Sequence, residues 1–163
     1  MSIYSPEKMP RQGEINAWAL TFITFGGVFF LSLRESIPSW VWFLSGMFAF
    51  SAASISLGNW IDRQTIIEIG TEAVRFENGL RKVRLEWQEV YSVKVTPARW
   101  GRSVQVSGKD GFFSFATLGV MTFRNEVKSR TGFEKGDEIL DSILREAKLD
   151  KYEKMNRTTV YSR

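Results

Sequence analysis

The chain contains neither cysteine nor histidine. Without cysteine it has no disulfide framework, no thiol nucleophile and no thiolate metal site, as is common in a reducing compartment. Without histidine it lacks the commonest general base and the commonest metal ligand. The sequence also has no G-x-x-x-x-G-K-[ST] phosphate loop, no G-x-G-x-x-G turn and no G-x-S-x-G elbow. These absences favour a protein that is not an enzyme and that uses no cofactor and no metal.

Charged residues are missing from two long apolar runs near the N-terminus, residues 15–33 and 37–61. At about 1.5 Å per helical residue, each run is long enough to cross a hydrocarbon core of about 30 Å. Only residues 34–36 separate them, so we expect an antiparallel transmembrane helical hairpin. The alternatives are core helices of a soluble protein and a cleaved signal peptide. The length of the first run and the second run directly after it argue against both.

Small residues predict how the two helices pack, because in lipid they let backbones approach closely. Ser45, Ala49 and Ala53 recur every four residues on one face, and Gly26 and Gly27 are the natural opposing surface. Tryptophans predict where the membrane interfaces lie, because amphipathic indole rings gather there. The expected interfacial residues are Trp18 and Trp60 on one side and Trp40 and Trp42 on the other.

Basic residues predict the orientation of this hairpin. Lys8 and Arg11 precede it and Arg63 follows it, whereas the turn contains only Arg34. The positive-inside rule therefore places both termini in the cytoplasm. Residues 62–163 contain 19 Lys and Arg against 15 Asp and Glu. This mild excess suits an anionic leaflet and falls far short of a nucleic-acid-binding signature.

Short alternating strands follow the hairpin and predict one small domain over residues 62–149. Residues 65–69 are the first strand, and AVRFE-NG-LRKVRLEW contains two more, joined at Asn78-Gly79. This dipeptide predicts a two-residue type I′ turn that places Val74 opposite Val83 and Arg75 opposite Lys82. Further strands are expected around residues 91–95, 104–106 and 113–115, with the last two forming a hairpin.

The rest of the domain changes its periodicity. Residues 117–132 fit either a last strand or a short helix over residues 123–130. Residues 136–149 have the apolar spacing of an amphipathic helix. Residues 1–14 are expected to be flexible and residues 150–163 disordered, because both segments are short and polar.

Two groups of basic residues are candidate contacts for headgroups or partners. Arg75, Lys82 and Arg84 share the outer face of their strand pair, either as a basic stripe for anionic lipid or an acidic partner, or as a solvated face neutralised by nearby glutamates. Residues 98–102 form a loop in which Trp100 stands between Arg99 and Arg102. This loop is suited to dip into a membrane interface; otherwise Trp100 packs over the mouth of a barrel.

A strand pair with a short turn, followed by W-x-x-[IV]-x-x-[IV] at Trp87, Val90 and Val93, gives residues 63–149 a family resemblance. The segment resembles the bacterial pleckstrin-homology-like domains of small membrane proteins. The resemblance implies an α+β protein whose N-terminal transmembrane hairpin precedes a small antiparallel barrel or curled sheet capped by a C-terminal helix. It also implies a cytoplasmic protein- or lipid-interaction domain without catalysis. The plan of two spans and a strand-rich domain is similar, too, to that of photosystem I assembly factors of cyanobacteria and plastids. These resemblances imply a protein integral to a bacterial inner membrane, or to a thylakoid membrane if it is cyanobacterial.

Two functions of different class fit these features. The first is a membrane-anchored, non-enzymatic interaction module, acting as an assembly factor or accessory subunit. Its partners would be the bilayer, another membrane protein and anionic lipid headgroups, with no nucleic acid. The alternative is a lipid-responsive or transport-associated membrane protein that associates through Ser45, Ala49 and Ala53.

Overall fold

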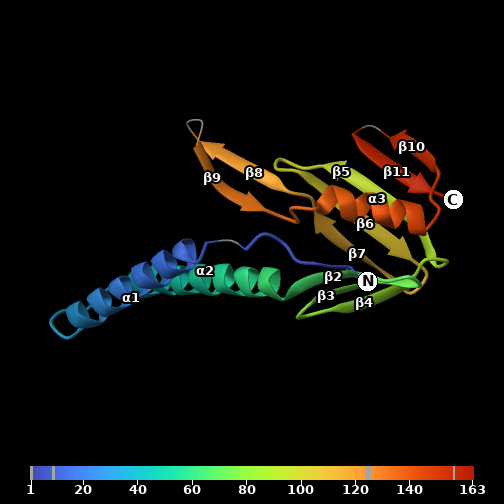
Figure 1. Ribbon diagram of the computed structural model, residues 1–163. Helices are drawn as coiled ribbons and strands as arrows, with labels where there is room; N and C mark the ends of the chain where they lie inside the picture. The colour runs from blue at the N-terminus through green and yellow to red at the C-terminus, as the bar shows by residue number, and fades with distance from the viewer. Residues whose placement is uncertain (1, 9, 124–125, 156) are drawn as a thin grey trace. The chain divides into compact units, whose positions relative to one another are not determined.

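The computed structural model describes residues 2–8, 10–123, 126–155 and 157–163. It divides into two compact units, residues 10–60 and residues 1–9 together with 61–163. The first unit is helical, and the second contains antiparallel sheets and one shorter helix (Figure 1). The predicted α+β class, with two long apolar helices before the sheets, is therefore confirmed. The domain is larger than the predicted range 62–149, because both ends of the chain join it.

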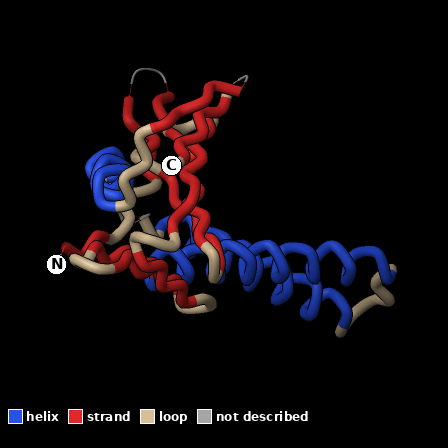
Figure 2. Tube along the Cα trace, turned by 90° about the vertical axis from the view of Figure 1, so that its right-hand side faces the viewer, coloured by secondary structure: helices blue, strands red, loops and turns tan. Residues whose placement is uncertain are grey.

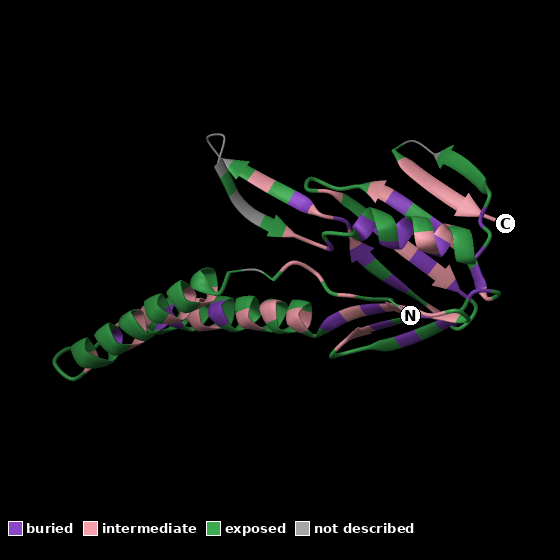
Figure 3. Ribbon diagram, in the orientation of Figure 1, coloured by how far each residue is buried: buried purple, intermediate pink, exposed green. Residues whose placement is uncertain are grey.

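Helices α1 (Gln12–Ser32) and α2 (Ser39–Gln64) run antiparallel beside each other (Figure 2). Their bounds differ by a few residues from the predicted 15–33 and 37–61, because backbone hydrogen bonding continues through the polar residues at the ends. Most of their large apolar side chains are exposed (Figure 3). In the most apolar 18-residue window of each helix only 11% of the residues are buried. Helices of a soluble core would instead bury this surface.

The buried face of this hairpin differs from the predicted stripe. It consists of Thr21 and Val28 on α1 and Ser45 and Ala52 on α2. Both pairs are seven residues apart, which is two helical turns and the spacing of a coiled-coil seam, not the predicted spacing of four. Ser45 lies in this seam as expected. Ala49 is half-buried, whereas Ala53, Gly26 and Gly27 are exposed.

The first sheet has the order β1-β2-β3-β4. Its strands are β1 (Ser2–Tyr4), β2 (Thr65–Ile69), β3 (Ala73–Asn78) and β4 (Lys82–Glu86). The expectation of a flexible segment 1–14 is wrong for β1, which pairs antiparallel with β2 and places Ile3 opposite Glu68. The open edge of β2 supplies the backbone partners, and the Tyr4 ring packs against the core.

The β3–β4 turn corrects the predicted register. Phe76, not Val74, faces Val83, and Arg84, not Lys82, faces Arg75. The Asn78 N–H donates to the Arg81 carbonyl at 3.1 Å, and the Asn78 side chain accepts a 2.8 Å hydrogen bond from the Arg81 backbone N–H. The two central residues of the turn are therefore Gly79 and Leu80, one position later than predicted. Because the shift is two residues, each side chain keeps its predicted face.

The second sheet has the order β10-β11-β5-β6-β7. Its strands are β5 (Val90–Pro97), β6 (Arg102–Gly108), β7 (Gly111–Ala116), β10 (Lys151–Met155) and β11 (Thr158–Ser162). The expected β6–β7 hairpin is present. The expectation of a disordered tail is wrong, because β11 pairs with β5. The Arg163 guanidinium secures this end by donating to the Trp87 carbonyl at 2.6 Å.

Strands β8 (Gly119–Phe123) and β9 (Glu126–Thr131) form a separate two-stranded hairpin. This outcome favours the strand alternative for residues 117–132. The helix proposed for residues 123–130 is wrong for the described residues, whereas residues 124 and 125 lie outside them.

One core unites the sheets with helix α3 (Gly136–Glu146), which ends three residues before the predicted helix. Ile139, Leu140 and Ile143 of α3 are buried there. Phe76 of β3 stacks on Phe113 of β7 with ring centroids 5.2 Å apart. The predicted barrel does not close. Strands β1 and β10 end their respective sheets, and no pairing joins them in the described part of the chain.

Candidate interaction surfaces

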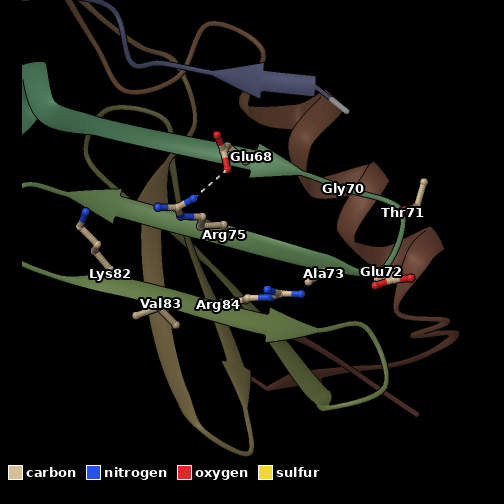
Figure 4. Close-up of a pocket in the computed structure, with 9 residues that line it drawn as sticks. All are labelled: Glu68, Gly70, Thr71, Glu72, Ala73, Arg75, Lys82, Val83 and Arg84. Carbon is tan, nitrogen blue, oxygen red and sulfur yellow. Dashed lines mark ion pairs between the residues drawn. The ribbon is translucent and has the colours of Figure 1, made fainter.

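A shallow pocket lies on the outer face of β2, β3 and β4 (Figure 4). Its volume is about 460 Å³. The loop from β2 to β3 forms one end, where the Gly70 N–H donates to the Ala73 carbonyl and the Gly70 carbonyl accepts from the Trp87 indole. The predicted stripe of Arg75, Lys82 and Arg84 is brought together here, because alternation along the strands sends all three side chains outward.

Glutamates neutralise most of this stripe. The Arg75 guanidinium lies 3.7 Å from a Glu68 carboxylate oxygen and 3.3 Å from a Glu77 oxygen, and Lys82 Nζ lies 2.7 Å from Glu77. Hydrogen bonding from Lys82, helped by the charges of Lys82 and Arg75, lowers the pKa of Glu77. Arg84 forms no ion pair within the described residues. The surface has mixed charge, so it suits a polar protein contact better than a polyanion.

Of the second predicted group, Arg99 and Trp100 lie in the connection between β5 and β6, and Arg102 is the first residue of β6. Trp100 is 39% exposed, and the Arg99 guanidinium lies 5.0 Å from its ring centroid. Arg102 points elsewhere and forms an ion pair with Asp137 at the start of α3. The three residues are therefore not one basic site. Arg99 and Trp100 remain available, while Arg102 holds the helix.

A cluster that the sequence reasoning missed lies at the β3–β4 turn. Leu80 is 66% exposed, although it is large and apolar. The adjacent Arg81 places its guanidinium 4.6 Å from the ring centroid of Phe112, which is half exposed on β7. Exposed aromatic and arginine side chains are the types that dominate protein interfaces. A leucine directly after Asn-Gly was the only signal for it in the sequence.

The helical hairpin positions its polar groups toward its own backbone or the neighbouring helix. Ser45 Oγ donates to the Val41 carbonyl at 3.0 Å, and Thr21 Oγ1 donates to the Ala17 carbonyl at 2.9 Å. The Trp18 indole N–H donates to Ser56 Oγ of the other helix at 2.8 Å. The other predicted interfacial tryptophans, Trp40, Trp42 and Trp60, are 66%, 39% and 42% exposed.

Within the described ranges, no group of three or more acidic side chains is placed to hold a metal ion. Comparison with known proteins finds no match to a family model, to a curated protein or to a solved structure.

Proposed function

We propose that the protein is a membrane-anchored, non-enzymatic interaction module in which α1 and α2 span a bilayer and the sheet-containing domain engages another membrane protein. The observation that carries this proposal is the exposure of apolar side chains along both helices. Phe22, Ile23, Phe43 and Phe50 are each about 70% exposed or more. In water such a surface promotes aggregation, whereas a hydrocarbon environment solvates it.

The pairing of β1 with β2 supports a double crossing. Residues 2–4 precede α1, and β2 begins directly after α2 at Thr65, yet the two strands are hydrogen-bonded. Both must therefore lie on one side of any membrane that the helices enter. An even number of crossings meets this requirement, whereas one spanning helix alone does not. With the basic residues that flank the hairpin, the cytoplasmic side is favoured.

The resemblance to bacterial pleckstrin-homology-like domains also supports a binding role. Two sheets share one core with a helix, and Trp87 is buried beneath the β2–β3 loop. This arrangement is compatible with the architecture of those domains, even though the barrel is open. The surface best fitted to a protein partner is the cluster of Leu80, Arg81 and Phe112. It combines an aliphatic side chain, a guanidinium and an aromatic ring, and it lies beside the mixed-charge face of β4.

Photo-crosslinking in native membranes tests this role. A photoreactive amino acid in place of Leu80 is expected to trap a specific membrane protein, and the same probe in place of Lys94 on β5 serves as the matched control. Phe112→Ala is expected to reduce recovery of that partner about tenfold or more, as is typical of an interface anchor. Lys94→Ala should leave recovery unchanged. The proposal fails if both probes trap the same proteins to the same extent, or if the chain is recovered alone.

A further inference from the structure

Strand β10 forms an open edge of the second sheet. It ends the strand order, with β11 on one side, and no further strand pairs with it among the described residues (Figure 1). The side chains from Lys151 to Lys154 are all exposed, and Tyr152 is 72% exposed (Figure 3). In an antiparallel edge strand, alternate residues direct their N–H and C=O groups away from the sheet. These groups can pair with a strand from another chain.

The charged side chains on and next to β10 are not neutralised within the domain. They are Asp150, Lys151, Glu153 and Lys154. Opposite the last three, β11 has only uncharged residues, which are Ser162, Val160 and Thr159. None of the four forms an ion pair with another described residue. The edge therefore presents charges of both signs that a second strand can complement.

This charge pattern is complementary to itself in one register. When two copies of β10 run antiparallel with Tyr152 facing Tyr152, Lys151 of each copy faces Glu153 of the other. Asp150 of each copy then faces Lys154 of the other. Sliding one strand by two residues places Glu153 on Glu153 in one direction and Lys151 on Lys151 in the other. Like charges directly opposite each other are destabilising, so the pattern selects the first register.

Tyr152 adds an aromatic contact at the centre of this register. Its ring centroid lies 6.4 Å from that of Tyr161 on β11, and Tyr161 packs against the core. Tyr152 thus lies at the outer end of a row of side chains on the core face of the sheet. In the paired register the two Tyr152 side chains lie opposite each other, and aromatic pairs across strands are stabilising.

We infer that β10 is a self-association edge, through which two copies of the chain form a symmetric dimer with one continuous sheet. A two-fold axis requires a contact in which every residue pair is reciprocal, and the D-K-Y-E-K pattern of residues 150–154 meets this requirement. Because the contact is a single strand pair, we expect a weak dimer whose amount depends on protein concentration. The inference goes beyond the proposed function and does not depend on membrane anchoring, because the domain contains the whole contact.

Cross-linking at the axis tests the inference, because the parent chain contains no cysteine. The full-length protein with Tyr152→Cys is purified in a mild detergent and treated with a short bismaleimide, and the dimer is quantified by gel electrophoresis. Lys109→Cys, at an exposed residue in the turn between β6 and β7, is the matched control. We expect a cross-linked dimer with Tyr152→Cys and little with Lys109→Cys. Equal cross-linking at both positions would overturn the inference, because it would report chance encounters within detergent micelles.

Charge reversal then tests the register in the Tyr152→Cys background. Lys151→Glu alone, or Glu153→Lys alone, places like charges opposite each other twice across the axis, so the dimer yield should fall about tenfold. The variant with both reversals exchanges the two charges and should restore the yield. A mixture of the two single variants should restore it as well, because each supplies the charge that the other needs. Circular dichroism checks that every variant keeps its fold.

The charge variants also contain the results that would refute the dimer. If the yield is the same in all of them, another surface brings the two chains together and β10 does not pair with itself. If the single reversals lower the yield and the double reversal does not restore it, Lys151 and Glu153 do not face each other across an axis. Cross-linking that requires a different protein would show that the occupant of the edge is not a second copy.

Discussion

At the scale of single residues, the outer face of the first sheet is organised by Glu77. It accepts from Lys82 and lies beside Arg75, which offsets the repulsion expected where Arg75 and Arg84 stand directly opposite each other. Because these contacts favour the carboxylate, the pKa of Glu77 is lowered from its ordinary value of 4.5. The basic stripe is thus a charge-balanced element of the sheet.

This lowered pKa predicts an acid-side loss of stability. A carboxyl whose folded-state pKa is depressed contributes stability above its unfolded pKa and loses that contribution as the pH falls through the folded value. We expect Glu77→Gln to be less stable than the parent at neutral pH, and this difference to shrink below about pH 4.5. Thermal unfolding of the full chain in detergent, followed by circular dichroism, measures it. Glu134→Gln, at an exposed carboxyl before α3, is the control. A difference that is independent of pH would contradict the prediction.

At the scale of elements, local patterns predicted the long helices, β2 and the β6–β7 hairpin, because apolar periodicity and turn residues act within each segment. The β3–β4 register was missed because the Asn78 side chain bonds to the Arg81 N–H, which a dipeptide preference does not reveal. Strands β1 and β11 were missed for another reason. β1 has only three residues and pairs with β2, which is distant in sequence. β11 lies in a polar segment and pairs with the distant β5 as well as with its neighbour β10. For the candidate sites, alternation predicted the grouping of Arg75, Lys82 and Arg84, but not the cross-strand contact of Arg81 with Phe112.

The buried contact between helices α1 and α2 leads to a second prediction at the scale of elements. Ala52 is fully buried, whereas a Cβ on Gly26 would meet no atom within 4 Å. Ala52→Leu should therefore overpack the helix pair and cost about 1–3 kcal/mol, while Gly26→Leu should leave its stability nearly unchanged. Thermal aggregation of the two variants in the same detergent compares them.

Size-exclusion chromatography with light scattering serves as the control for Gly26→Leu. A change in oligomeric state would show that Gly26 faces a second copy rather than lipid. Equal destabilisation by both substitutions would contradict the placement of Ala52 between the helices and of Gly26 outside their contact.

At the scale of the whole molecule, the strand pairing and the anchor constrain each other. If α1 and α2 both cross the bilayer, the β1–β2 ladder requires the N-terminal residues and the domain to share one side, and the turn at residues 33–38 to lie on the other.

Single cysteines at positions 36, 5 and 71, introduced into the cysteine-free parent one at a time, report this topology in cells that express the protein. A membrane-impermeant maleimide should label Ser36→Cys in intact cells. It should label Ser5→Cys and Thr71→Cys only after the membrane is permeabilised, because both lie beside the sheet, on the side that we propose to be cytoplasmic. Labelling of Ser5→Cys and Thr71→Cys from opposite sides would be incompatible with the ladder and with a double crossing, whereas protection of all three positions would show that the turn does not reach the far surface.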